Sequence, residues 1–125
     1  MNTLTYRALV ISGQNTELVT YQQEDISCLF VDNVADIPQA YQGFVADVAL
    51  LGVQFLKDED ITRAISLCAE LQLDVIAVVP EQELDRYDSK YTFQDFILFP
   101  FRYGELITRI KAAKCRNKGR APSRV

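Results

Sequence analysis

The segment that decides the fold is DFILFPFRYGELITRIKA, residues 95–112. It begins with a short apolar run and continues through Pro100 into a stretch whose apolar residues recur at helical spacing. The run DFILF is apolar on both faces, which predicts a strand over 95–99 inside a parallel sheet. The residues after it predict a helix over 103–115, whose core-facing positions are Leu106, Ile107, Ile110 and Ala113. The segment therefore indicates a strand followed directly by a helix.

The same alternation extends back to the N-terminus. Apolar runs predict four earlier strands, over residues 6–12, 26–31, 45–52 and 73–79. The stretches between them predict helices over residues 16–24, 33–41, 58–72 and 82–89. Pro38 is compatible with a helix over 33–41 only in the first turn. Strands alternating with helices predict an α/β fold: a doubly wound, five-stranded parallel sheet of flavodoxin-like type, strand order 2-1-3-4-5, with helices on both faces.

The helix over 58–72 carries the clearest amphipathic pattern. Its acids crowd the first turn, where the helix dipole favours negative charge. One face of it is apolar and should pack on the sheet, through Ile61, Ala64, Ile65, Cys68 and Leu71.

The composition indicates one globular domain. The chain has 125 residues, of which 49% are hydrophobic and 24% charged. No apolar run approaches the roughly 20 residues of a membrane span, and the N-terminus lacks a signal-peptide core, so we expect a soluble, cytoplasmic protein with no membrane contact.

Residue types that serve many enzymes are missing. The chain has no histidine, and Cys28, Cys68 and Cys115 lie far apart. Zinc sites and Ser-His or Cys-His catalysis therefore lack their usual participants. We expect no enzyme activity, no metal and no cofactor.

The charge is unevenly distributed along the chain. Residues 1–110 carry seven Lys or Arg against seventeen Asp or Glu, whereas residues 111–125 carry six basic residues and no acid. The acidic body should repel nucleic acid, so we expect no direct nucleic-acid binding by this domain. Gly119 and Pro122 predict that the last helix has ended before them. We therefore expect a domain over residues 1–116 and a basic linker or disordered tail over 117–125.

The ends of the predicted strands are the candidate site, because the crevice of such sheets lies at the carboxyl ends of the strands. Two segments there, DVALLGVQFLKDEDI (47–61) and DFILFPFRYGELITRIKA (95–112), resemble the receiver domain of response regulators, the CheY-like fold. The family patterns are D-L-(V/I)-L-L-D-x-x-L-P-x-x-D-G-(I/L) and D-Y-(L/I)-x-K-P-F-x-x-x-E-L-x-A-R-(I/V)-x-A. The resemblance covers residues 6 to about 116.

The resemblance implies a phosphorylation site of which every component is replaced. The family's phosphoacceptor aspartate falls on Gly52, and its magnesium-binding acid pair falls on Ser12 and Gly13. Its hydroxyl residue falls on Val79, and its lysine falls on Phe99. The chain is thus similar to a degenerate receiver, a pseudo-receiver. We expect Phe99 and Val79 to fill the crevice with apolar side chains.

Two other acids are poor substitutes for the missing phosphoacceptor. The family carries an aspartate like Asp47 at the opposite end of the sheet, and Asp58 fits the start of an acidic helix. The alternative to a degenerate site is that Phe99 and Val79 are core residues of a flavodoxin-like domain that never was a receiver.

The closest resemblance is to the winged-helix OmpR/PhoB class of response regulators. In that class the face formed by the fourth helix, the fifth strand and the fifth helix makes a symmetric dimer joined by salt bridges. The corresponding residues here are Asp95, Glu105, Arg109 and, on the helix over 82–89, Arg86. The alternative is an ordinary pair between Glu105 and Arg109 within one helix.

Three functions follow from these observations. The first is a phosphorylation-independent pseudo-receiver, the regulatory domain of an atypical response regulator in two-component signalling and transcription regulation. It would act as a homodimer, and its expected effector is a fused or separate DNA-binding domain. The second is a clock- or sensor-type pseudo-receiver that binds a heterologous signalling protein or a small ligand. The third, a flavodoxin-like cofactor-binding enzyme, is disfavoured because the loop after the first strand lacks a glycine-rich phosphate-binding motif.

Overall fold

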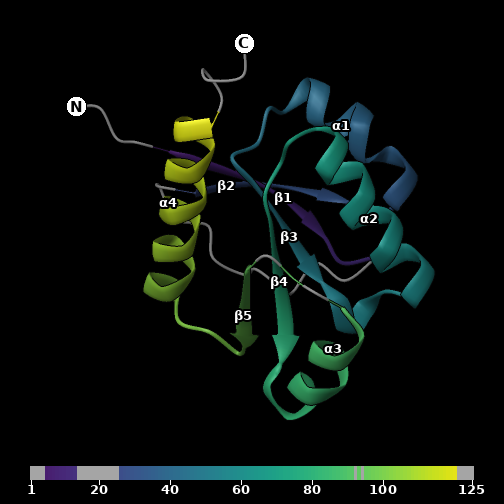
Figure 1. The fold of residues 1–125 in the computed structure, drawn as a ribbon. Coiled ribbons are helices and arrows are strands. Elements are labelled where there is room, and N and C mark those ends of the chain that lie inside the picture. The colour runs from purple at the N-terminus through teal and green to yellow at the C-terminus, as the bar shows by residue number, and fades with distance from the viewer. Residues whose placement is uncertain (1–4, 14–25, 92, 94, 121–125) are drawn as a thin grey trace.

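The computed structural model describes residues 5–13, 26–91, 93 and 95–120, with side chains to residue 115. Its strands form one parallel sheet of order β2-β1-β3-β4-β5 (Figure 1). The strands are β1 (Tyr6–Ile11), β2 (Ile26–Val31), β3 (Val48–Gly52), β4 (Val75–Pro80) and β5 (Asp95–Phe99). The predicted fold class and strand order are confirmed.

Helices connect the strands. They are α1 (Ile37–Gly43), α2 (Asp58–Glu70), α3 (Leu84–Lys90) and α4 (Tyr103–Arg120). Short 3-10 turns precede α1 and α3, and a third, Val53–Phe55, follows β3. Pro38 lies in the first turn of α1, as predicted. The predicted helix over 16–24 lies outside the described residues.

The last helix is longer than the sequence pattern predicts. It runs to Arg120, five residues beyond the expected end at 115, and so includes Gly119. Alanine and lysine in its second half are strong helix formers, and a single glycine costs a helix only about 1 kcal/mol. The local preference of the neighbours therefore outweighs Gly119. The proposed boundary between domain and tail at residue 116 stays a prediction.

Helix α4 lies on one face of the sheet and α1 and α2 lie on the other (Figure 1), and a core cluster fills the space on each face. The first cluster lies beneath α1, α2 and α3, and the second lies beneath α4. Side chains of β4 alternate between them, so that Val79 belongs to the first and Val78 to the second. In α2 the buried residues are Ile61, Ala64 and Cys68, while Ile65 and Leu71 are partly buried. In α4 all four predicted core residues are buried: Leu106, Ile107, Ile110 and Ala113.

Two of the three cysteines behave as apolar groups. Burial raises the pKa of the Cys68 thiol to about 12 and that of the Cys28 thiol to about 11. Both thiols are therefore protonated at neutral pH, and neither is a reactive thiolate. Cys115 is exposed. Within the described part of the chain, no helix is both long and apolar enough to cross a membrane.

Candidate functional site

The carboxyl edge of the sheet brings the five sequence-predicted site positions to neighbouring strand ends. Ser12 and Gly13 follow β1, Gly52 ends β3, Val79 lies near the end of β4 and Phe99 ends β5. Ser12, Gly52 and Val79 are buried, and Phe99 is half-buried. The edge is therefore lined by small and apolar groups.

Gly13, which follows β1, lies close to the 3-10 turn that follows β3. Its φ of +61° lies in the left-handed region that side-chain-bearing residues rarely adopt. A Cβ atom built at this position would stand 3.2 Å from the Phe55 carbonyl oxygen. The backbone here consequently leaves no room for a carboxylate side chain without a shift of the neighbouring turn.

Val79 and Phe99 do not pack together, so the expectation that they jointly fill the crevice is wrong. Val79 is buried in the first core cluster, whereas Phe99 packs against the second. In the sheet register Pro80 pairs with Phe99, which places Val79 one position earlier and on the opposite face. Phe99 instead meets Phe101 edge-to-face, with ring centroids 5.9 Å apart.

The two remaining candidate aspartates are engaged elsewhere. Asp47 lies at the amino end of β3, as expected, and accepts a hydrogen bond of 2.8 Å from the Arg7 backbone N–H. It also forms an ion pair with Lys114 of α4, at 3.6 Å. Asp58 is the first residue of α2, again as expected. Among the described residues, no three Cys, Asp or Glu side chains gather as ligands for a metal ion.

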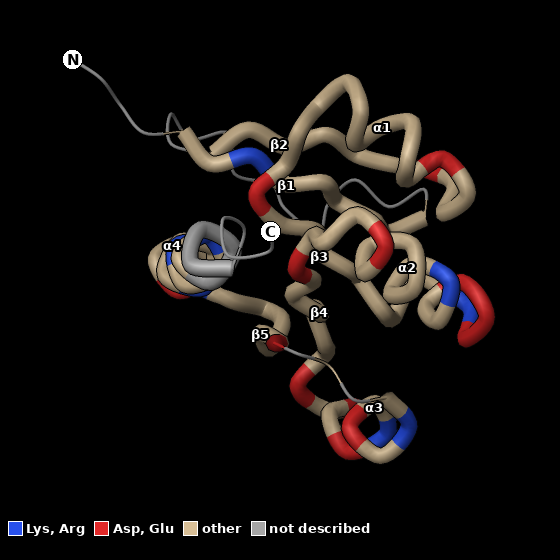
Figure 2. The backbone as a smooth tube through the Cα atoms, turned by 45° about the horizontal axis from the view of Figure 1, so that its top comes forward, with Lys and Arg blue, Asp and Glu red and all other residues tan. Residues whose placement is uncertain are grey.

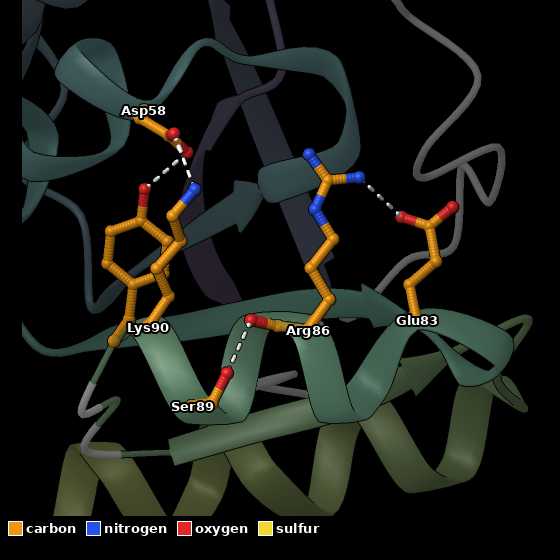
Figure 3. Close-up of polar contacts among 6 residues, drawn as sticks. Asp58, Glu83, Arg86, Ser89 and Lys90 are labelled. Atoms are coloured by element: carbon orange, nitrogen blue, oxygen red, sulfur yellow. Dashed lines mark hydrogen bonds and ion pairs between the residues drawn. The ribbon is translucent and has the colours of Figure 1, made fainter.

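Asp58 holds α3, a contact that sequence reasoning missed (Figure 3). Its Oδ2 accepts a hydrogen bond from Lys90 Nζ at 2.6 Å, and its Oδ1 accepts one from the Tyr91 hydroxyl at 2.7 Å. These hydrogen bonds, first that of Lys90 and then that of Tyr91, lower the pKa of the Asp58 carboxyl group. No local sequence signal joins residues that are 32 and 33 positions apart.

The predicted dimer residues come from three elements: Asp95 from the edge strand β5, Glu105 and Arg109 from α4, and Arg86 from α3. Figure 2 shows acidic and basic residues on both flanking helices. Arg109 of α4 pairs with Asp95 of β5 within the chain, at 2.9 Å, rather than with Glu105. The structure therefore does not show the alternative, an ion pair between Glu105 and Arg109. Arg86 lies on α3, 3.8 Å from Glu83, and both side chains are largely exposed (Figure 3).

The fold is that of a receiver domain. It is similar to a response regulator receiver domain protein from Clostridium thermocellum, with a TM-score of 0.67 and 20% identity over 90% of this chain and 97% of that one. It is also similar to NtrX from Brucella abortus, solved in complex with ATP, with a TM-score of 0.69 and 14% identity over 92% of this chain. The chain spans 28% of the NtrX chain. No family model and no curated protein sequence matches it.

The predicted likeness to receivers is thus confirmed at the level of the fold. The degenerate phosphorylation site and the OmpR/PhoB class stay predictions.

Proposed function

We propose that this domain is a regulatory module that acts by self-association through α3, β5 and α4, without phosphoryl transfer. The observation that carries the proposal is that small and apolar groups line the described carboxyl ends of the strands. Gly52 and Val79 offer no acceptor or hydroxyl there, and a side chain at Gly13 would need a positive φ and a shift of the Phe55 carbonyl group. Magnesium-assisted phosphoryl transfer needs acidic oxygen ligands, and the five described positions at this edge do not supply them.

Opposite charges on α4 and α3 favour self-association. Glu105 is exposed and forms no ion pair with any described side chain. Arg86 is exposed, and its guanidinium lies 3.8 Å from the Glu83 carboxylate and 5.4 Å from the centre of the Tyr87 ring. In a twofold dimer each surface meets its own copy, so Glu105 of one protomer can pair with Arg86 of its partner, twice. Such pairs set orientation and specificity more than raw affinity.

Half-buried side chains of β5 provide the apolar part of the same surface. Phe96, Leu98 and Phe99 are all partly exposed, and β5 is the edge strand of the sheet. An edge strand with half-exposed apolar residues is a natural site of association. The pair between Arg109 and Asp95 borders this patch and fixes α4 against β5.

Sedimentation equilibrium over a wide concentration range, without a phosphodonor, tests the proposal. The wild type should dimerise, and Glu105→Arg should weaken the dimer roughly tenfold, because two symmetric charge pairs become repulsive. The double variant Glu105→Arg with Arg86→Glu should restore dimerisation, since it reverses both partners. Arg109→Glu should also weaken the dimer, with thermal unfolding as a control for loss of its internal pair.

A wild type that is monomeric at every concentration would overturn self-association and favour the heterologous partner of the second hypothesis. Addition of Mg²⁺ and a small phosphodonor should leave tyrosine fluorescence and the dimer equilibrium unchanged. A response to both together would contradict phosphorylation independence.

A further inference from the structure

The short helix α3 has little apolar contact with the rest of the domain. Of its seven residues only Tyr87 is buried, Leu84 is half-buried and the other five are exposed. A helix of this length is not stable on its own and depends on tertiary contacts. The position of α3 must therefore depend heavily on contacts other than core packing.

The Asp58 carboxylate supplies such contacts from a firmly held element. Asp58 belongs to α2, which buries Ile61, Ala64 and Cys68 in the first core cluster. Each carboxylate oxygen takes a different donor, Lys90 at the end of α3 and Tyr91 immediately after it. Two donors on one carboxylate constrain both the end of α3 and the segment that leaves it.

The stacked rings of Tyr87, Tyr91 and Phe93, here called the aromatic column, connect the end of α3 to the approach to β5. The ring of Tyr91 stacks on that of Tyr87, with centroids 6.5 Å apart, and on that of Phe93, at 5.5 Å. Phe93 lies two residues before Asp95, where β5 begins. The hydroxyl of Tyr91 thus bonds to α2 while its ring lies between the buried residue of α3 and the approach to β5.

We propose that Asp58, Lys90 and Tyr91 form a latch that holds α3 in place and thereby sets the interface beside β5. When the latch is closed, α3 is fixed to α2, and the position of Arg86 on α3 is fixed with it. When it is open, α3 loses these two hydrogen bonds to α2 and is held by its core contact through Tyr87, so the charge pattern of the interface is no longer fixed. This regulation of the interface rests on the proposed self-association, whereas the hold on α3 does not.

Two variants open the latch with minimal change in shape. Asp58→Asn removes the charge that Lys90 needs, and Tyr91→Phe removes the hydroxyl but keeps the stacked ring. Glu59→Gln is the matched control, because Glu59 is exposed, lies next to Asp58 in the first turn of α2 and forms no hydrogen bond or ion pair with the described residues of α3. All three are made in the full chain.

Hydrogen exchange measures the hold on α3. The backbone N–H of Tyr91 donates to the Tyr87 carbonyl at 2.9 Å, so its exchange reports whether the end of α3 is closed. We expect exchange at Tyr91 to accelerate about fivefold in Asp58→Asn, and less in Tyr91→Phe, with amides of α4 unchanged. Glu59→Gln should exchange like the wild type. Unchanged exchange at residue 91 in both latch variants would overturn the latch.

Sedimentation equilibrium on the same variants measures the coupling to the interface. We expect the dimer Kd to rise two- to fivefold in Asp58→Asn, roughly the range that loss of one surface ion pair permits, and to stay constant in Glu59→Gln. Faster exchange with an unchanged Kd would overturn the coupling. A wild type that never dimerises would overturn the proposed function, and hydrogen exchange would still decide whether the latch exists.

Discussion

The two helices that flank β5 are held to the sheet in different ways. Helix α4 has 18 residues, and four of its side chains up to residue 115 are buried apolar groups, whereas α3 has seven residues and buries one. The stabilisation from buried apolar surface does not depend on pH, but a carboxylate with two polar donors responds to pH and to competing charges. The surface beside β5 therefore combines one fixed side, α4, with one adjustable side, α3. This difference indicates where regulation can act without loss of the fold.

The largest effect is expected from a cavity beneath α4. Ile110 is fully buried in the second core cluster. Ile110→Ala should lower the free energy of unfolding by about 2–5 kcal/mol, because it removes apolar contacts and leaves a void. Urea denaturation followed by circular dichroism measures the loss, and Lys111→Ala at an exposed position is the control. A loss as small as that of the control would contradict the assignment of α4 as the fixed side.

A smaller effect is expected beneath α3. Tyr87→Ala removes the buried side chain of that helix and one member of the aromatic column. The loss in global stability should be about 1–3 kcal/mol, less than for Ile110→Ala, because α3 can detach while the rest of the domain stays folded. Hydrogen exchange should locate the change in residues 84–91. Equal acceleration throughout α4 would show that α3 and α4 unfold as one unit and remove the contrast between them.

The smallest effect is expected from acidification. The pKa of Asp58 is lowered below its ordinary value of 3.8 in the folded state, first by Lys90 and then by Tyr91. Its contribution is therefore fully present above pH 3.8 and is lost as the pH falls through the lowered value. A carbon NMR titration should show Asp58 titrating below 3.8, shifted upward more by Lys90→Gln than by Tyr91→Phe. An identical titration in the wild type and both variants would contradict the latch geometry.

Most of the fold could be predicted from the sequence because it depends on local patterns. Five apolar runs gave five strands, and helical spacing correctly placed Leu106, Ile107, Ile110 and Ala113 in the core. The placement of Asp47 at the amino end of β3 and of Asp58 at the start of α2 also agreed with the structure. Apolar periodicity and helix-start signals are properties of short segments, which one sequence displays in full.

The errors concern relations between segments. The opposite faces of Val79 and Phe99 follow from the register of β4 and β5, which no single strand encodes. The pair between Asp95 and Arg109 joins a strand to the next helix. The Asp58 latch joins the helix that precedes β4 in the chain to the helix that follows it. Such contacts depend on the assembled geometry. The extension of α4 past Gly119 has a different cause, the helix preference of its neighbours.

The left-handed backbone of Gly13 has a consequence for anyone who would engineer this domain. Installing an acid at position 13 by substitution alone would strain the main chain. A side chain at position 13 would still approach the Phe55 carbonyl oxygen at 3.2 Å and adopt an unfavourable φ. The carbonyl group of Phe55 would have to move by a few tenths of an ångström, so an attempt to build phosphate chemistry here begins with the main chain of this turn.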